Sequence, residues 1–161
     1  MKKTYVISAF PACGKSHCFK NLQNIFTILD SDSSEFSWIK DSEGNNTKER
    51  NPEFPNNYIK HISDNIGKVD VVFVSSHDVV RKALYENNIE TTIIYPEKYM
   101  KEVFLQRYRE RGNNEGFISF ISNNWDNFIE DIEFEDYGFD KISLNLDQPY
   151  ITVELLKRTV K

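Results

Sequence analysis

The chain has 161 residues and a formal net charge of −5, with 20 Lys and Arg residues against 25 Asp and Glu residues. This length is typical of one domain with a sizeable core, and a hydrophobic fraction of 39% argues against a disordered chain. The negative charge disfavours nucleic acid or an anionic membrane as a partner, unless a local basic patch overcomes it.

The chain contains two cysteines, Cys13 and Cys18, which are too few for a disulfide framework or a zinc site. This count fits a reducing, cytoplasmic location. The N-terminal segment resembles a secretory leader only superficially, because Pro11, Gly14 and Lys15 interrupt its apolar stretch. No apolar run approaches the ~18 residues of a membrane-spanning helix, so we expect no membrane partner.

Runs of apolar and β-branched residues predict five strands, over residues 5–9, 26–29, 69–75, 90–95 and 141–146. Helical periodicity predicts helices over 15–22, 57–66, 78–87, 98–111 and 117–132, and a last one within 151–161. Because strands alternate with helices, we expect crossover connections and a parallel sheet. The continuous apolar run over 71–74 predicts a central strand that is buried on both faces.

Two segments need a separate interpretation. Apolar residues recur at spacings of three and four along 117–132, which predicts a stripe facing the core, made of Phe117, Phe120, Ile121, Trp125, Phe128, Ile129 and Ile132. Residues 40–55 have the composition of a loop, which predicts a mobile insert on the domain rather than a linker between two domains. We therefore expect residues 1–161 to form a single domain.

Residues 9–16, Ala-Phe-Pro-Ala-Cys-Gly-Lys-Ser, fit the phosphate-binding loop G-x-x-x-x-G-K-[ST] at every fixed position except the first. Ala9 stands there for Gly, which is tolerable if its φ stays negative. In such a loop the backbone amides surround phosphate oxygens, the lysine reaches the β- and γ-phosphates, and the hydroxyl coordinates Mg²⁺.

This motif predicts that Lys15 is catalytic and that Ser16 binds Mg²⁺. The expected ATP-binding residues are Pro11, Ala12, Cys13, Gly14, Lys15, Ser16 and His17. The alternative is a Gly-Lys-Ser that merely begins a helix.

With this loop between a predicted strand and a predicted helix, the chain resembles the P-loop kinases. The likeness is to the branch of nucleoside, nucleotide and small-metabolite kinases, which includes adenylate kinase, shikimate kinase and phage deoxynucleotide kinases. The resemblance implies a three-layer αβα fold with a five-stranded parallel sheet of order 2-3-1-4-5. Within the single domain it also implies an acceptor-binding insert at 33–66 and a short lid at 107–116.

Asp30 and Asp32 follow the second predicted strand, at the edge of the sheet where ligands gather in open α/β folds. The sequence Asp30-Ser31-Asp32 resembles the Asp-x-Asp of shikimate-kinase-type enzymes. That resemblance implies that Asp30 helps to hold the metal and that Asp32 contacts the acceptor hydroxyl. The alternative is a solvated turn that is rich in Asp and Ser for local reasons.

Arg107 and Arg111 lie four residues apart, so they share one helix face and could both point at a triphosphate, while Arg109 points elsewhere. This pattern resembles the arginine-bearing lid of nucleotide kinases, which implies a catalytic role for Arg107 and Arg111. Arginines before a glycine are also what the end of a helix favours, so capping is the alternative.

The insert carries aromatic and basic residues at the position where nucleotide kinases place their acceptor-binding domain. Phe36, Trp38, Arg50 and Tyr58 could stack on a base and pair with a phosphate, or they could pack the insert onto the domain.

Together these features predict a Mg²⁺-dependent phosphotransferase that uses ATP on a nucleoside or nucleotide. An NTPase switch is the first alternative, disfavoured because Asp70 lies at the beginning of the strand over 69–75, whereas a metal-binding acid would lie at its end. A non-catalytic nucleotide-binding module, a kinase of a non-nucleotide metabolite and a kinase of polynucleotide ends stay open as further alternatives.

Overall fold

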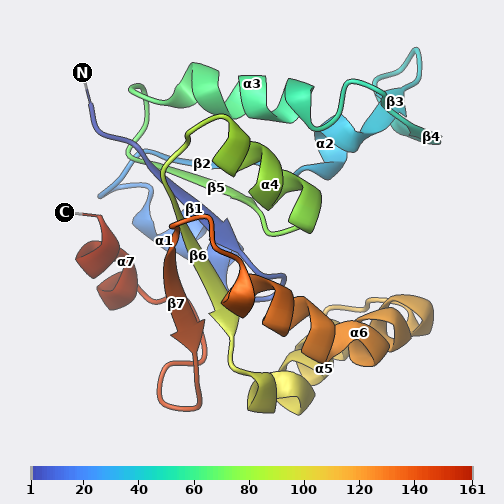
Figure 1. Ribbon diagram of the computed structural model, residues 1–161, viewed down its shortest axis with the longest axis vertical. Coiled ribbons are helices and arrows are strands. Elements are labelled where there is room, and N and C mark those ends of the chain that lie inside the picture. The colour runs from blue at the N-terminus through green and yellow to red at the C-terminus, as the bar shows by residue number, and fades with distance from the viewer. Residues whose placement is uncertain (1, 161) are drawn as a thin grey trace.

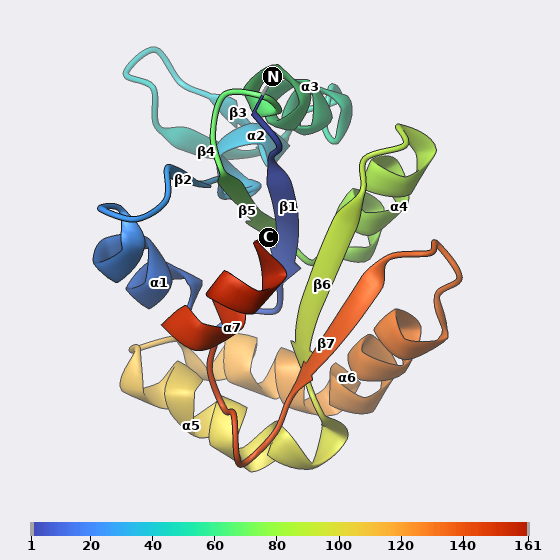
Figure 2. The ribbon, with the colours of Figure 1, turned by 90° about the vertical axis from the view of Figure 1, so that its left-hand side faces the viewer.

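The structure is a computed structural model that describes residues 2–160. Five strands form one parallel sheet, with helices on both of its faces (Figure 1). The strands are β1 (Tyr5–Ala9), β2 (Ile28–Asp30), β5 (Val71–Ser75), β6 (Thr91–Pro96) and β7 (Asp140–Leu144). Their order in the sheet is β2-β5-β1-β6-β7 (Figure 2). Counting only these five strands, this is order 2-3-1-4-5, so the predicted fold class and strand order are confirmed.

The main helices are α1 (Lys15–Leu22), α3 (Asn56–Asn65), α4 (Asp78–Glu86), α5 (Lys101–Glu110), α6 (Glu115–Phe134) and α7 (Val153–Thr159). A 3-10 turn, η1 (Lys98–Met100), precedes α5. Helix α6 starts before the predicted range because the Asn114 side chain caps it, accepting a hydrogen bond from the Phe117 amide at 2.8 Å. Within residues 2–160, none of the helices combines the length and apolar character that crossing a bilayer requires.

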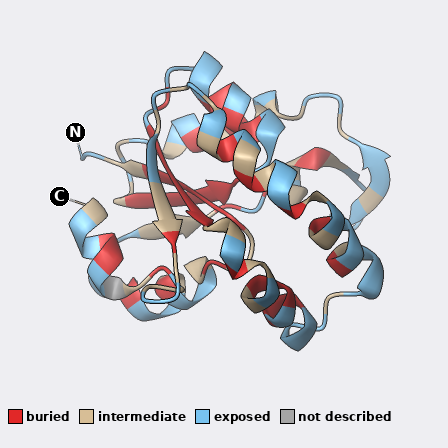
Figure 3. Ribbon diagram, turned by 60° about the horizontal axis from the view of Figure 1, so that its bottom comes forward, coloured by how far each residue is buried: buried red, intermediate tan, exposed pale blue. Residues whose placement is uncertain are grey.

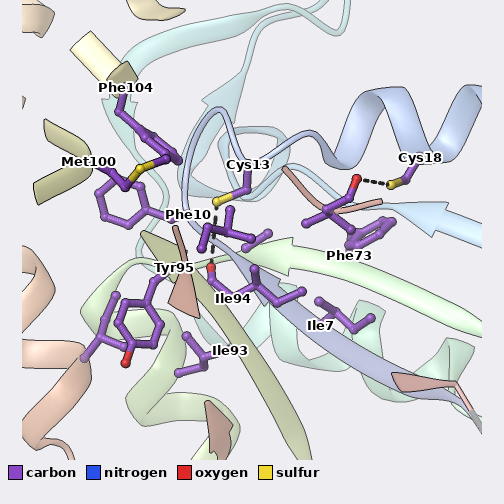
Figure 4. Packing of buried hydrophobic residues seen from close by; sticks show 14 of the residues in the cluster. Ile7, Phe10, Cys13, Cys18, Phe73, Ile93, Ile94, Tyr95, Met100 and Phe104 are labelled. Atoms are coloured by element: carbon purple, nitrogen blue, oxygen red, sulfur yellow. Dashed lines mark hydrogen bonds between the residues drawn. The ribbon is translucent and has the colours of Figure 1, made fainter. Parts of the chain in front are cut away.

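The core has two halves because successive strand residues point to opposite faces of the sheet. Val71 and Phe73 of β5 pack with the cluster that contains residues of α1, α5, α6 and α7, whereas Val72 and Val74 pack with α3 and α4. All of β5 is buried, as expected for a central strand. Figure 3 shows the buried residues gathered on the strands of the sheet and on the helices around it. Figure 4 shows the first cluster around Phe10, which follows β1 directly.

The insert over residues 33–66 contains helix α2 (Ser34–Ser37), a hairpin and helix α3. The hairpin pairs β3 (Trp38–Lys40) with β4 (Asn46–Arg50) in antiparallel fashion. The prediction of a loop over 40–55 is therefore wrong for β4. Four of the five residues of β4 are exposed, so the strand has no alternation of apolar and polar residues that could have indicated it.

Candidate functional site

A cleft of about 810 Å³ opens at the carboxyl edge of the parallel sheet. Its lining includes Ala9, Asp30 and Ser75, the last residues of β1, β2 and β5. Ligands of open α/β sheets bind at this edge, where the loops that leave the strands converge. The 9–16 loop, the 30–32 segment and helix α6 all contribute to the lining.

The 9–16 loop has a backbone shape that explains its small residues. Ala9 belongs to strand β1 and pairs with Ser75 and Ile94 in the sheet, so a side chain there causes no backbone strain. Gly14 has a φ of 97°, and a Cβ at this position would lie 3.4 Å from the Tyr150 ring. Position 14 therefore favours glycine for two reasons, its left-handed backbone conformation and the close approach of Tyr150.

Helix α1 begins at the cleft without a side-chain cap. Gly14 is its N-cap residue and makes no side-chain capping hydrogen bond, and Gly14, Lys15 and Ser16 line the cleft. The amides of a helix's first turn have no partner within the helix, and they carry the positive end of its dipole. The start of α1 and the Lys15 ammonium group therefore give this part of the cleft the character of an anion site.

Two of the seven residues predicted to bind ATP, Cys13 and His17, are not part of the described cleft lining. The Cys13 amide already donates to the Phe10 carbonyl at 3.2 Å, and its side chain is fully buried beside the Ile94 carbonyl oxygen (Figure 4). His17 is exposed on α1, where its carbonyl accepts from Asn21, and it is not part of the described cleft lining.

Side chains of helix α5 donate hydrogen bonds to backbone carbonyls of the 9–16 loop. The Tyr108 hydroxyl donates to the Pro11 carbonyl at 3.1 Å. The Arg107 guanidinium donates to the carbonyls of Ala12 at 3.0 Å and Pro149 at 2.8 Å, and it lies 3.7 Å over the Tyr150 ring. These contacts tie the loop both to α5 and to the segment before α7.

The two arginines predicted to act as a lid therefore differ. Arg107 and Arg111 both line the cleft, and Arg109 is not part of the described lining, as their spacing predicted. Arg107 is buried and donates to backbone carbonyls, whereas Arg111 is exposed at the end of α5. The predicted lid at 107–116 consists of the last turn of α5, a connection over 111–114 and the first residues of α6.

A buried tyrosine, Tyr58, holds the segment that carries Asp30 and Asp32. The Tyr58 hydroxyl donates to the Ser31 carbonyl at 2.7 Å and accepts from the Ser75 amide at 3.2 Å. Burial raises the pKa of Tyr58 to about 12, so the hydroxyl stays protonated and able to donate. Both aspartates line the cleft together with Ser16, and one Asp32 carboxylate oxygen accepts from the Ser34 amide at 2.9 Å.

The oxygen donors in this cleft are of the kind that magnesium takes. Mg²⁺ prefers oxygen donors, and proteins usually hold it through one or two carboxylates, substrate phosphates and water. Ser16, Asp30 and Asp32 supply such oxygens in one cleft. In the part of the chain that the structure describes, no group of three or more His, Cys, Asp and Glu side chains could hold a metal by itself.

The sequence left two uses open for the aromatic residues of the insert, an acceptor pocket or packing, and their contacts are packing contacts within the chain. The Phe36 and Tyr58 rings lie 5.2 Å apart, and the Arg50 guanidinium lies 4.3 Å over the Trp38 ring of the hairpin. Phe36, Trp38, Arg50 and Tyr58 are all absent from the described lining of the cleft.

Helix α6 instead contributes a wall of the cleft, and the three aromatic residues of that wall belong to the stripe that the sequence interpretation assigned to the core. Two of these, Phe117 and Phe128, do pack partly against that core. Phe117, Phe120, Phe128 and Asp131 line the cleft, and Phe120 is 57% exposed. At 100° per residue, these four lie about 100° around the helix from the buried face centred on Trp125. The predicted stripe of seven residues covers about half of the helix circumference, which is more than the buried face alone. That width is the signal that could have revealed the separate face toward the cleft.

The end of β5 carries no free carboxylate. Ser75 and Ser76 stand there, while Asp70, at the other end, accepts hydrogen bonds from the backbone amide and the side chain of Thr27. His77 also lines the cleft. Loss of hydration lowers the pKa of its ring below the ordinary value, and this effect outweighs the nearby carboxylates of Asp78 and Asp32, which raise the pKa.

Both thiols are buried, and neither is activated. Burial raises the pKa of Cys13 to about 12 and that of Cys18 to about 11, and the Cys18 thiol donates to the Ile151 carbonyl at 3.0 Å. A thiol that stays protonated is a poor nucleophile, so this site has no cysteine suited to covalent catalysis.

No protein-family model matches this chain, and a search of the curated proteins also finds no match. The fold and the site define the class of protein: a mixed α/β domain with a five-stranded parallel sheet and a ligand-sized cleft at its carboxyl edge.

Proposed function

We propose that the protein is a Mg²⁺-dependent phosphotransferase that moves the γ-phosphoryl group of ATP to a nucleoside or nucleotide. The observation that carries this proposal is the start of α1. There Gly14, Lys15 and Ser16, at the spacing of a phosphate-binding loop, line the same cleft as Asp30 and Asp32.

Each side chain has a distinct role in this proposal. Lys15 and the amides at the start of α1 neutralise charge on the phosphate oxygens, where transition-state charge develops. Ser16 and Asp30 hold the magnesium ion, which supplies further neutralisation of the β- and γ-phosphates when it is bound. Asp32 orients the acceptor hydroxyl and accepts its proton, and Arg111 approaches the transferring group from the end of α5.

Transfer to an acceptor is favoured over simple hydrolysis by two features. The strand end that would carry a metal-binding acid in a hydrolytic motor holds Ser75 and Ser76. The cleft, at about 810 Å³, lies in the range of small-molecule sites and extends beyond the loop to the aromatic face of α6. That extension gives room for a second substrate beside the phosphates.

The test combines ATP binding with turnover. We expect Mg·ATP to raise the melting temperature and to yield ADP only when an acceptor is added. Lys15→Ala is expected to lower transfer by about 10²-fold or more with an unchanged melting temperature, because Lys15 contributes charge rather than packing. Lys20→Ala, an exposed lysine of the same helix, is the matched control.

The other outcomes separate the alternatives. ADP formation at the same rate without an acceptor identifies an NTPase, and ATP binding without turnover on any acceptor identifies a binding module. Normal transfer by the Lys15→Ala variant removes the central claim.

A further inference from the structure

The face of α6 toward the cleft offers an aromatic surface to a ligand. The rings of Phe120 and Phe128 lie 5.7 Å apart and at an angle of 58°, and both line the cleft. Phe117 extends this surface and packs edge-on against Tyr108 at 5.3 Å. Such a surface binds a flat ring by stacking and apolar contact, which are favourable for every aromatic base.

The cations that line the cleft are largely committed to the protein itself. Arg81 is buried and holds Glu135 through two hydrogen bonds, of 2.8 and 2.7 Å, and it also donates to the Ser76 carbonyl. Arg107 donates to two backbone carbonyls. Within residues 2–160, Lys15 and Arg111 are the remaining Lys or Arg side chains of the lining.

Acidic groups outnumber these two cations. Besides Asp30 and Asp32, the lining includes Asp78, Glu110 and Asp131. A bound triphosphate requires the positive charge of Lys15 and Arg111 for itself. A second anionic substrate beside α6 would therefore meet carboxylates without a matching cation, whereas a neutral substrate can donate hydrogen bonds to them.

We propose that the α6 face formed by Phe117, Phe120, Phe128 and Asp131 binds the acceptor, and that the acceptor is a neutral nucleoside rather than a nucleotide. This inference rests on the proposed phosphotransfer. The base stacks on Phe120, Asp131 accepts from an amino or imino group of the base, and the sugar hydroxyl is directed toward Asp32.

The chemical step follows from this placement. The acceptor oxygen forms a bond to the γ-phosphorus of ATP, and the bond from that phosphorus to the β,γ-bridging oxygen breaks, so that ADP leaves. The hydroxyl proton passes to the Asp32 carboxylate and then to water. The products are ADP, a nucleoside monophosphate and one proton.

The experiment measures binding rather than turnover, by titration calorimetry with Mg²⁺ and a non-hydrolysable ATP analogue present. The probes are the common ribonucleosides and deoxyribonucleosides, each paired with its 5′-monophosphate. We expect at least one nucleoside to bind, about tenfold or more tightly than its monophosphate. Phe120→Ala is expected to weaken nucleoside binding about tenfold without changing the affinity for the analogue, whereas Phe120→Tyr keeps it.

Phe134→Ala is the matched control, because Phe134 is also on α6, is 80% exposed and is not part of the described lining. Tighter binding of the monophosphates, or equal effects of Phe120→Ala and Phe134→Ala, overturns the inference. Loss of analogue affinity in Phe120→Ala also overturns it, because the face would then serve the donor.

Failure of the proposed function has a different signature. If the analogue does not bind but a nucleoside does, the phosphotransferase proposal falls while the nucleoside site stands. If the analogue binds and neither nucleosides nor monophosphates do, the inferred substrate class is wrong while the ATP site remains.

Discussion

The 9–16 loop and the 33–66 insert both contain residues that the sequence indicated as functional, yet only in the loop do such residues line the cleft. Gly14, Lys15 and Ser16 of the loop line the cleft. In the insert, Tyr58 is fully buried and Trp38 pairs with Arg50 on a hairpin. Of the two regions, only the loop presents indicated side chains to the cleft.

The difference lies in how specific each signal is. A phosphate-binding loop works through its backbone amides, so fixed spacing and a glycine are needed and few other structures need the same pattern. An aromatic ring near an arginine is equally useful for packing and for stacking on a ligand. Composition alone cannot separate these two uses, because the direction of the side chain depends on what packs beside it.

The strongest test of this comparison replaces the two carboxylates beside the loop. Asp32→Asn is expected to lower transfer by about 10²-fold or more with little change in Mg·ATP affinity, because it removes a positioned proton acceptor. Asp30→Asn is expected to raise the Mg²⁺ concentration needed for half-maximal activity. Titration of Mg²⁺ and ATP against both variants checks this, and an Asp32 variant with the higher Mg²⁺ requirement would exchange the two roles.

The two cleft arginines should separate stability from catalysis. Arg107→Ala removes two hydrogen bonds from a buried guanidinium to carbonyls, which costs about 2–3 kcal/mol and lowers the melting temperature by about 5–10 °C. Arg111→Ala should leave the melting temperature unchanged and lower kcat about tenfold or more, because its contact forms only with the substrate. Calorimetry and steady-state kinetics on both variants decide this. Equal melting temperatures would return Arg107 to a purely catalytic role.

Within the insert, substitutions of Tyr58 and Trp38 should each lower the free energy of unfolding, and Trp38→Ala should not affect transfer. A shared acceptor pocket would predict a loss of transfer in both. Tyr58→Phe removes the hydroxyl that joins Ser31 to Ser75, so we expect a loss of about 1–2 kcal/mol in the free energy of unfolding. Trp38 is half-buried and pairs with the exposed Arg50, so Trp38→Ala is expected to cost about 1 kcal/mol, the scale of a cation–π pair near the surface, and to leave transfer unchanged. Urea unfolding and transfer rates check both. A larger loss of transfer in Trp38→Ala would move the acceptor site back to the insert.

The smallest effect on activity, and the sharpest check on the packing of the loop, concerns the thiols. At pH 8, Cys13 and Cys18 should react slowly with iodoacetamide until urea unfolds the chain, because both are buried. Burial raises their pKa values to about 12 and about 11, above the ordinary thiol value of 9.0, so between pH 9 and 11 the folded state binds more protons than the unfolded state. The free energy of unfolding should therefore fall as pH rises through this window, and less steeply in a Cys13→Ala, Cys18→Ala double variant. Rapid labelling of the native protein would contradict the burial of the two cysteine side chains.

Several parts of the molecule could be predicted because their signals are local. The apolar run of β5 indicated a central strand, and the alternation of strands and helices indicated the parallel sheet. The hairpin β3–β4 gave no such signal, because its strands are short and largely exposed. Phe120 was assigned to the core because a helical stripe records apolar character but not what lies opposite each residue.

The sequence by itself determined the class of fold, the order of the five sheet strands and the main helices along the chain, and the position of the loop with Lys15, since periodicity and motif spacing follow from local backbone geometry. Only the tertiary structure decided which side chains meet. It turned Tyr58 into a support for the segment that carries Asp32, tied Arg107 to the carbonyls of the loop, and directed Phe120 into the cleft. These outcomes depend on contacts between residues tens of positions apart in the chain, where burial and hydrogen bonding to a distant partner override what each residue type favours locally.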